Sequence, residues 1–284
     1  MKYFYLLLFT LSNGFIFGQQ YEYSARFGHF SGAVSFSYNS SGCFYVSDSE
    51  TNEIFKIDTL GNVLKYTGGY GWDQGAFDNP AGVFATPLNL YAADRNNHRI
   101  EIFDKDLNFL SVIKTRDDAQ QDEAVFGFPL GCVVSSFGDI FVLDSENKKI
   151  VKFNSAGQYT LRFGDYTSGS FALNNPKAIA LSAENNIYVL DDSVLCVFDQ
   201  FGAGLNKFRL ENNINNINIT FGTLILNSVD RLYIVKPDQA RAQITSVILG
   251  GFEFNTDISA GMMLENSLFV LTKKEILVFK IKKG

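Results

Sequence analysis

The feature that most constrains this sequence is a pattern of apolar and polar residues that recurs six times along the chain. Each copy contains an apolar run, a short polar turn opened by a small polar side chain, and a second apolar run, as in residues 89–103. The turn-opening residues are Asp48, Asp94, Asp144, Asp191, Ser228 and Thr272. They are separated by 46, 50, 47, 37 and 44 residues, a period that is typical of repeated β-sheet units.

Further apolar segments accompany these copies on both sides. Upstream of copies two to four, an apolar run begins at Pro80, Pro129 and Pro176. Pro is tolerated at the first residue of a strand, where no ladder donor is required. Downstream, another strand-like run follows a Gly or Asn, as in residues 61–66. Each repeat therefore supplies four short strands, which form one propeller blade. The sequence predicts an all-β fold, a six-bladed β-propeller of four-stranded antiparallel blades.

The second copy, Phe77–Phe84 followed by Asp94–Phe103, resembles an NHL repeat. Copies one, three and four resemble it in part, and copies five and six only in the order of their strands, so the resemblance covers residues 21–281. It implies the propeller fold. It implies little about activity, because the family includes peptide binders, RNA binders and enzymes. The polar turn shortens after the third copy, which predicts tighter hairpins in blades four to six.

The two ends of the chain predict how the ring closes. The segment Tyr21–Gly28 ends in Arg-Phe-Gly, as does Tyr159–Gly164, the expected outer strand of blade three. The last copy ends at Ile281 with three strands, so residues 21–28 are expected to supply its outer strand. Closure of this kind leaves only short, protected sheet edges.

Residues 1–18 have the pattern of a secretory signal peptide: Lys2, then an apolar stretch to Phe17, then Gly18 before a plausible cleavage site. A membrane anchor is the competing interpretation, but a span requires roughly 20 apolar residues and this stretch is shorter. We therefore expect residues 19–284 to form a single propeller domain that is secreted or periplasmic, with no membrane span after cleavage.

The charge of the chain argues against some partners. The formal net charge is −6, and 19% of the residues are charged. Binding to nucleic acid is dominated by cationic contacts to phosphate, so an acidic balance disfavours nucleic acid as a partner. The same balance disfavours anionic membrane surfaces.

Catalytic and metal-binding patterns are weak in this sequence. The recurring aspartates Asp48, Asp94, Asp144 and Asp191 fit a structural role, because Asp side chains set turns by accepting bonds from backbone amides. Histidine occurs only as His29 and His98, too few for a three-His zinc site. The expected innermost strands contain no carboxylate, and Asp257 and Asn218 are the nearest polar candidates. The sequence predicts no catalytic residue, no metal site and no cofactor.

The three cysteines, Cys43, Cys132 and Cys196, each lie in an apolar run and share no metal-ligand spacing. They are expected to be small hydrophobic residues in the sheet cores. The sequence leaves open whether any of them pairs.

One end of the ring carries the most informative loops, because connections between blades and turns between middle strands emerge on the same face. The candidate ligand-binding residues there are Tyr70, Trp72, Asp73, Asn97, His98, Arg99 and Tyr166. Exposed Trp and Tyr residues on rigid scaffolds are typical binding residues. The alternative is that these aromatic side chains pack between blades, as Phe77 and Phe171 are expected to do.

These observations favour an exported, non-enzymatic binding or protein-interaction scaffold whose ligand, a protein, a peptide or a glycan, binds the loop face. A metal-dependent hydrolase or lyase of the lactonase-like propeller class is the alternative, which depends on fold analogy alone.

Overall fold

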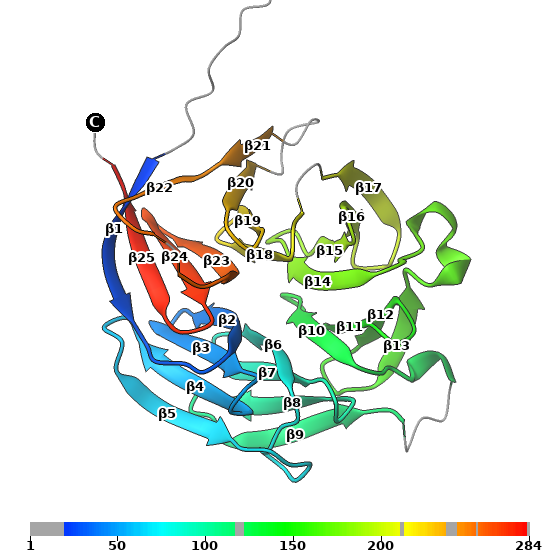
Figure 1. Cartoon of the computed structure of the whole chain (residues 1–284). Coiled ribbons are helices and arrows are strands. Elements are labelled where there is room, and N and C mark those ends of the chain that lie inside the picture. The colour runs from blue at the N-terminus through cyan, green and yellow to red at the C-terminus, as the bar shows by residue number, and fades with distance from the viewer. Residues whose placement is uncertain (1–19, 117–121, 211–212, 237–242, 254, 283–284) are drawn as a thin grey trace, which may run out of the picture.

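The computed structural model describes residues 20–116, 122–210, 213–236, 243–253 and 255–282. Their strands form six sheets arranged as blades around a centre (Figure 1), so the predicted six-bladed β-propeller is confirmed. The predicted leader, residues 1–18, lies outside the described residues. Among the described residues, no helix combines the length and apolar character needed to cross a membrane.

The blades are built in chain order. Blade one contains β2 (Ala33–Asn39), β3 (Cys43–Asp48), β4 (Glu53–Asp58) and β5 (Val63–Gly68). Blade two contains β6 (Pro80–Ala85), β7 (Asn89–Asp94), β8 (Arg99–Asp104) and β9 (Phe109–Lys114). Blade three contains β10 (Pro129–Val134), β11 (Ile140–Asp144), β12 (Lys149–Phe153) and β13 (Tyr159–Phe163). Blade four contains β14 (Pro176–Leu181), β15 (Ile187–Asp191), β16 (Val194–Phe198) and β17 (Gly204–Arg209).

Blade five contains β18 (Asn216–Thr220), β19 (Thr223–Asn227), β20 (Leu232–Lys236) and β21 (Gln243–Ser246). Blade six contains β23 (Ile258–Leu264), β24 (Ser267–Thr272) and β25 (Ile276–Ile281), extended by β1 (Gln20–Phe27) and β22 (Ile248–Gly250). Two short 3-10 helices, η1 (Asp122–Ala124) and η2 (Tyr166–Phe171), lie in connections between blades.

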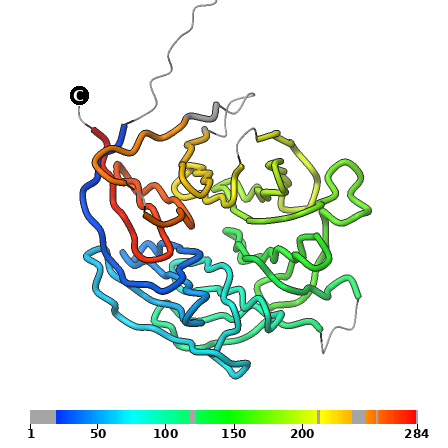
Figure 2. Tube along the Cα trace, in the orientation of Figure 1, coloured from blue at the N-terminus to red at the C-terminus, as the bar shows by residue number. Residues whose placement is uncertain are grey.

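The ring closes where the two ends of the described chain meet. Strand β1 pairs antiparallel with β25, with Tyr21 opposite Ile281 and Phe27 opposite Ile276, and the two segments run side by side in Figure 2. The predicted closure by residues 21–28 is therefore confirmed. The sequence did not predict β22, which pairs parallel with β1 and makes the closing sheet five-stranded.

The hydrophobic cores lie between neighbouring blades. Six clusters of buried residues occur among the described residues, one at each junction between adjacent blades. Cys43, Cys132 and Cys196 are buried and unpaired. Burial raises the pKa of the Cys132 thiol to about 12, so this side chain behaves as an inert hydrophobic group.

The aspartates Asp48, Asp94, Asp144 and Asp191, here called the anchoring aspartates, are all buried. Asp48 accepts hydrogen bonds from the amides of Glu50 and Thr51 in its own turn, and from Ser31 and Gly32 in the connection before the blade. The other three likewise accept at least one amide of the preceding connection. Each carboxylate therefore positions the start of its blade's innermost strand, which goes beyond the predicted role in the turn.

The repeat pattern misplaced one position. In blade five the last residue of the second strand, opposite the first residue of the innermost strand, is Asn227 and not Ser228. The turn from Ser228 to Arg231 is therefore as long as the turns of blades one to three. The prediction of a tighter hairpin is wrong for blade five. It is confirmed for blade four, where only Asp192 and Ser193 separate β15 from β16.

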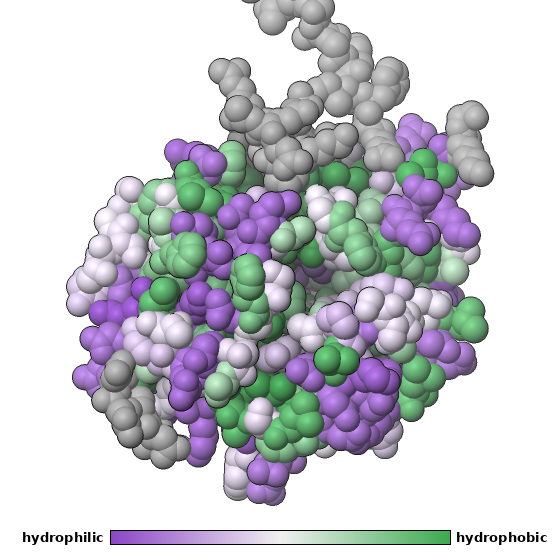
Figure 3. All heavy atoms as spheres, turned by 180° about the vertical axis from the view of Figure 1, so that it is seen from behind, coloured by the Kyte–Doolittle hydropathy of each residue, from purple (hydrophilic) through white to green (hydrophobic). Residues whose placement is uncertain are grey.

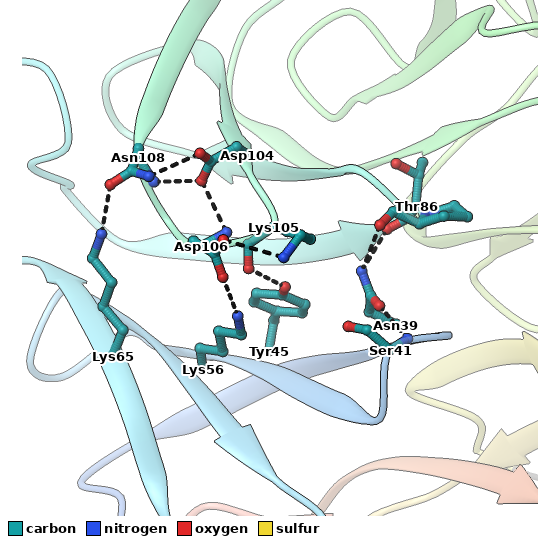
Figure 4. A network of polar contacts seen from close by, with 11 residues as sticks. Asn39, Ser41, Tyr45, Lys56, Lys65, Thr86, Asp104, Lys105, Asp106 and Asn108 are labelled. Carbon is teal, nitrogen blue, oxygen red and sulfur yellow. Dashed lines mark hydrogen bonds and ion pairs between the residues drawn. The ribbon is translucent and has the colours of Figure 1, made fainter.

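Polar side chains also join blade to blade on the face opposite the candidate loops (Figure 4). Lys56 Nζ of blade one lies 2.6 Å from Asp106 Oδ1 of blade two. Tyr45 donates its hydroxyl to the carbonyl oxygen of Lys105 at 2.5 Å, and Asn39 Nδ2 donates to Thr86 O at 2.8 Å. These bonds cross the blade junction and fix the relative position of the two sheets.

Candidate functional site

The connection from β5 to β6, residues 69–79, is held against blade two by one buried arginine. Arg99 Nε donates to Asp94 Oδ2 at 2.8 Å. Its two terminal nitrogens donate to the carbonyl oxygens of Trp72, Asp73 and Ala76 at 2.7, 3.0 and 2.7 Å. The N–H groups of the guanidinium are therefore already hydrogen-bonded to carbonyl oxygens of the loop and to Asp94. Arg99 is a support for the loop, and it is not available to a ligand.

Asn97 has a similar supporting role. Its Nδ2 donates to Gly71 O and to Asp94 Oδ2, both at 2.8 Å. The structure thus brings together Trp72, Asp73, Asn97 and Arg99, as the prediction of a shared face required. Asn97 and Arg99 position the loop, whereas Trp72 and Asp73 are part of it.

A second carboxylate, Glu101 of β8, lies beneath the same loop. Its side chain is fully buried and lies 3.1 Å from Arg99 Nη2. Both oxygens accept from Gly75 N, at 3.3 and 3.1 Å. Burial raises the pKa of Glu101 to about 7, against the opposing effect of Arg99. Burial also raises the pKa of Asp94. Sequence reasoning missed Glu101, which follows a strand pattern that gives no sign of a buried charge.

His98 acts on the next connection, between blades two and three. Its Nδ1 accepts from Phe128 N at 3.0 Å, and its ring meets the Phe128 ring edge-on with centroids 4.3 Å apart. Burial, and then the charge of Arg116, lower the pKa of His98. The imidazole is therefore held as the neutral acceptor, and its contacts are structural.

The three aromatic candidates project into solvent. Tyr70 is 70% exposed, Trp72 73% and Tyr166 86%. The alternative that they pack between blades is wrong for all three. That expectation is confirmed for Phe77, which is fully buried, and for Phe171, which packs on the junction of blades three and four. The exposed rings follow glycines or open a short helix, where the chain turns away from the core.

The candidate residues do not form one continuous site. Tyr70, Trp72 and Asp73 belong to the first connection, whereas Tyr166 opens η2 in the third connection, between blades three and four. Asp165 caps η2 by accepting from Thr167 N at 3.0 Å. Ligand binding at the predicted residues stays a prediction. Three of these residues lie together in residues 69–79, here called the Trp72 loop. Part of the second connection, residues 117–121, lies outside the described residues.

A separate cavity of about 680 Å³ lies at the centre of the ring and is lined by all six innermost strands. It contains Asp257 and Asn218, the two polar residues that the sequence placed nearest the channel. None of the seven candidate loop residues lines it. Viewed from behind, the face in Figure 3 is hollowed near its middle, and hydrophobic and hydrophilic residues are intermixed around it.

The cavity wall is mainly apolar, with Asp257 as the one carboxylate among its described residues. Within the described part of the chain, no group of three or more His, Cys, Asp or Glu residues is arranged to hold a metal ion. Sequence reasoning missed three cations on the wall, Arg95, Lys177 and Lys273. Arg95 and Lys273 each follow the turn-opening residue of their copy, so aligning the repeats with one another would have found them.

Known proteins resemble this chain in fold and, over half of its length, in sequence. No protein-family model matches the chain. A segment of Protein brain tumor from Drosophila melanogaster is 32% identical over 145 residues, which is 50% of this chain and 13% of that protein. B-box type zinc finger protein ncl-1 from Caenorhabditis elegans is 28% identical over 145 residues, 50% of this chain and 16% of that protein. The similarity therefore spans only a small part of these relatives.

Solved structures share the architecture across most of the chain. Virginiamycin B lyase from Staphylococcus aureus, as an inactive variant with quinupristin, is 12% identical with a TM-score of 0.62, covering 88% of this chain and 80% of that one. A gluconolactonase from Xanthomonas campestris is 14% identical with a TM-score of 0.64, covering 90% and 88%. At these identities the likeness shows the fold alone, a six-bladed β-propeller.

Proposed function

We propose that this chain is an NHL-type propeller that acts as a non-enzymatic binding or protein-interaction scaffold, with the Trp72 loop as its contact surface. Two relatives with NHL repeats match half of the chain, which supports an interaction module. The observation that carries the proposal is the pairing of exposed aromatic rings with a buried support. Tyr70 and Trp72 are exposed on a loop whose backbone is fixed by Arg99.

This arrangement suits recognition for a physical reason. A loop that is already ordered loses little conformational freedom when it binds, so less of the contact energy is offset. Trp and Tyr rings supply large contact areas with few rotatable bonds. The ligand is a protein, peptide or glycan whose apolar or ring surface stacks on Trp72, with Asp73 beside it to receive a donor.

The test is a binding screen of the purified chain against peptide and glycan arrays, followed by Trp72→Ala. Loss of at least tenfold in affinity with an unchanged melting temperature supports the proposal. The matched control is Phe137→Ala, because Phe137 is 70% exposed but lies in the turn between β10 and β11, at the other end of the ring and outside the cavity wall. If Phe137→Ala weakens binding as much as Trp72→Ala, or no array member binds, the proposal is wrong.

We also propose export, on the basis of residues 1–18 alone. Expression of the chain with and without these residues, followed by fractionation, tests it. Export predicts that the full chain reaches the periplasm or medium with its amino terminus near residue 19, while the truncated chain stays inside the cell. Recovery of the full chain in the cytoplasm with Met1 or Lys2 at its terminus contradicts it.

The alternative function is a metal-dependent hydrolase or lyase. Its support is the fold shared with a lyase and a gluconolactonase. Asp257 and Asn218 are oxygen donors in the cavity wall, whereas a hard cation such as Ca²⁺ takes about six to eight oxygen ligands. Metal analysis of the purified protein, with lactone hydrolysis measured before and after chelation, separates this alternative from the scaffold.

A further inference from the structure

Three positive side chains line one mouth of the central cavity. Arg95 lies in the turn after β7, Lys177 is the second residue of β14, and Lys273 lies in the turn after β24. All three positions are at the end of the ring where the innermost strands begin. They come from blades two, four and six, which alternate around the ring, so the charges surround the mouth and are not gathered on one side.

These charges are only partly balanced. Asp257 is the one carboxylate among the described cavity residues. Lys177 Nζ lies 3.4 Å from Asp192 Oδ1, but Asp192 is 67% exposed, and exposed ion pairs are weak and screened. Within the described ranges, Lys273 has no ion-pair partner. The Arg95 guanidinium lies over the Phe128 ring, 5.9 Å from its centroid, and its side chain has neither a hydrogen bond nor an ion pair there. Arg95 Nε is shielded from solvent without a partner, which is rare in native proteins.

Below this mouth the wall is mainly apolar. Val34, Leu130 and Ile219 line it on different blades and are partly exposed. Some hydroxyls in this region are already used between blades: Ser37 Oγ, for example, accepts from Ala85 N at 2.9 Å. A cavity of about 680 Å³ falls within the usual size of small-molecule sites, in which apolar walls bind the body of a ligand and a few polar groups fix its orientation.

We propose that the central cavity binds a small amphipathic carboxylic acid, with its carboxylate at the mouth that Arg95, Lys177 and Lys273 surround and its apolar body against the wall below. A guanidinium matches a carboxylate in shape and charge, and a cleft lined by one sign of charge concentrates the opposite ion. This site is separate from the Trp72 loop and does not depend on the function proposed for it.

The first test uses the unaltered full chain and three probes: 3-phenylpropanoate, its neutral amide 3-phenylpropanamide, and acetate. Isothermal titration is expected to show binding of 3-phenylpropanoate at least about tenfold tighter than either other probe, a difference of about 1.4 kcal/mol. Added salt should weaken it, because the mouth is open to solvent. Equal binding of the acid and the amide overturns the proposal, as does failure of the acid to bind at millimolar concentration.

The second test locates the site by comparing substitutions at Lys273 and Arg95 with one at the adjacent Lys274. Lys273→Met and Arg95→Met should each weaken 3-phenylpropanoate binding about threefold to tenfold. Lys274→Met is the control, because Lys274 lies in the same turn but donates to Ser31 O at 2.7 Å and does not line the cavity. It should leave affinity within about twofold. A loss in Lys274→Met equal to that in Lys273→Met overturns the proposal.

Two controls keep the result distinct from other causes. Melting temperatures show whether each variant folds. If a variant does not fold, the comparison of acid with amide on the unaltered chain still tests the proposal. Trp72→Ala should leave 3-phenylpropanoate binding unchanged, so failure of the loop proposal and failure of the cavity proposal give different results. Loss of acid binding in Trp72→Ala contradicts a separate site in the cavity.

Discussion

Blades one to four differ from blades five and six in how the start of the innermost strand is held. In blades one to four the anchoring aspartate accepts hydrogen bonds from the connection before the blade. In blade five Asn227 occupies that position, and its Nδ2 donates forward to the carbonyl oxygens of Ile258 and Ser259 in blade six. In blade six, among the described residues, Thr272 Oγ1 accepts only from its own turn, at Lys274 N and Glu275 N.

The difference teaches that the repeat pattern is one of several ways to fix a blade. An acceptor-only carboxylate suits connections that present free amides, whereas an amide side chain suits exposed carbonyls. In blades five and six, backbone carbonyls take the amides instead, at Asn227 O from Asn215 N and at Val229 O from Ile258 N. The fold therefore persists where the sequence pattern fades.

The largest expected effect is on blade six, which depends on the far end of the chain. Deleting residues 20–27 removes β1, exposes the edge of β25 and leaves β22 without its partner. Tyr21 is buried, and Tyr23 stacks on Phe252 with centroids 5.1 Å apart. Each buried aromatic contributes about 1.5–3 kcal/mol, so we expect a loss of several kcal/mol in unfolding free energy.

Urea denaturation checks this prediction, with a chain that begins at residue 19 as the control. A truncated protein that keeps the unfolding free energy of the control would show that blade six is stable without closure. A blade without an anchoring aspartate would then be stable without support from the far end of the chain.

The second prediction addresses the comparison directly. Asp48→Ala removes the acceptor for four backbone amides, at Ser31, Gly32, Glu50 and Thr51. Leaving a buried donor unsatisfied costs about 1–3 kcal/mol, so we expect a loss of about 3 kcal/mol or more. Thr272→Val leaves only the amides of its own turn without an acceptor, and about 1 kcal/mol is expected. Equal losses in the two variants would remove the distinction between the two groups of blades.

A third prediction concerns pH and the anchor of blade two. Glu101 has a pKa of about 7 in the folded protein, raised by burial. The folded state therefore holds its proton more tightly than the unfolded state, and this contribution to stability is lost as pH rises from about 4.5 to 7. At about 1.4 kcal/mol per pH unit, Glu101→Gln should gain about 2–3 kcal/mol relative to the unaltered chain between pH 5 and pH 8.

The measurement is urea unfolding of both proteins at several pH values, with the difference between them taken at each. Both proteins contain His98, whose lowered pKa makes its contribution to stability fall as pH falls. Subtracting their unfolding free energies at each pH removes this contribution. A difference that is flat with pH would mean that Glu101 ionises normally. The matched control, Glu184→Gln, alters an exposed acid and should show no comparable gain with rising pH.

The smallest effect is expected at the exposed aromatic rings. Trp72→Ala and Tyr166→Ala should each change the unfolding free energy by less than about 0.5 kcal/mol, because surface side chains contribute little to stability. Thermal unfolding checks this. A loss of several kcal/mol in Trp72→Ala would mean that the ring supports the first connection together with Arg99, and would end its use as a probe of binding.

Much of the fold could be predicted because it depends on local pattern. The spacing of the turn-opening residues and the prolines determined the blades, the innermost strands and, through Tyr21–Gly28, the closing strand. The same pattern failed at Ser228, because residues 227 and 228 are both small and polar and only the ladder with Asn216 distinguishes them. Strand β22 could not be predicted, since its pairing joins residues that are far apart in the sequence.

The sequence by itself determined that the chain repeats a four-stranded unit six times and that its two ends must meet, because alternation and turn chemistry act between near neighbours. Only the tertiary structure decided which polar groups are buried and which converge. Glu101 became buried under a loop from another blade, and Arg95, Lys177 and Lys273 came to surround one mouth. Burial and convergence depend on distances across the ring, and the order of residues along the chain does not record those distances.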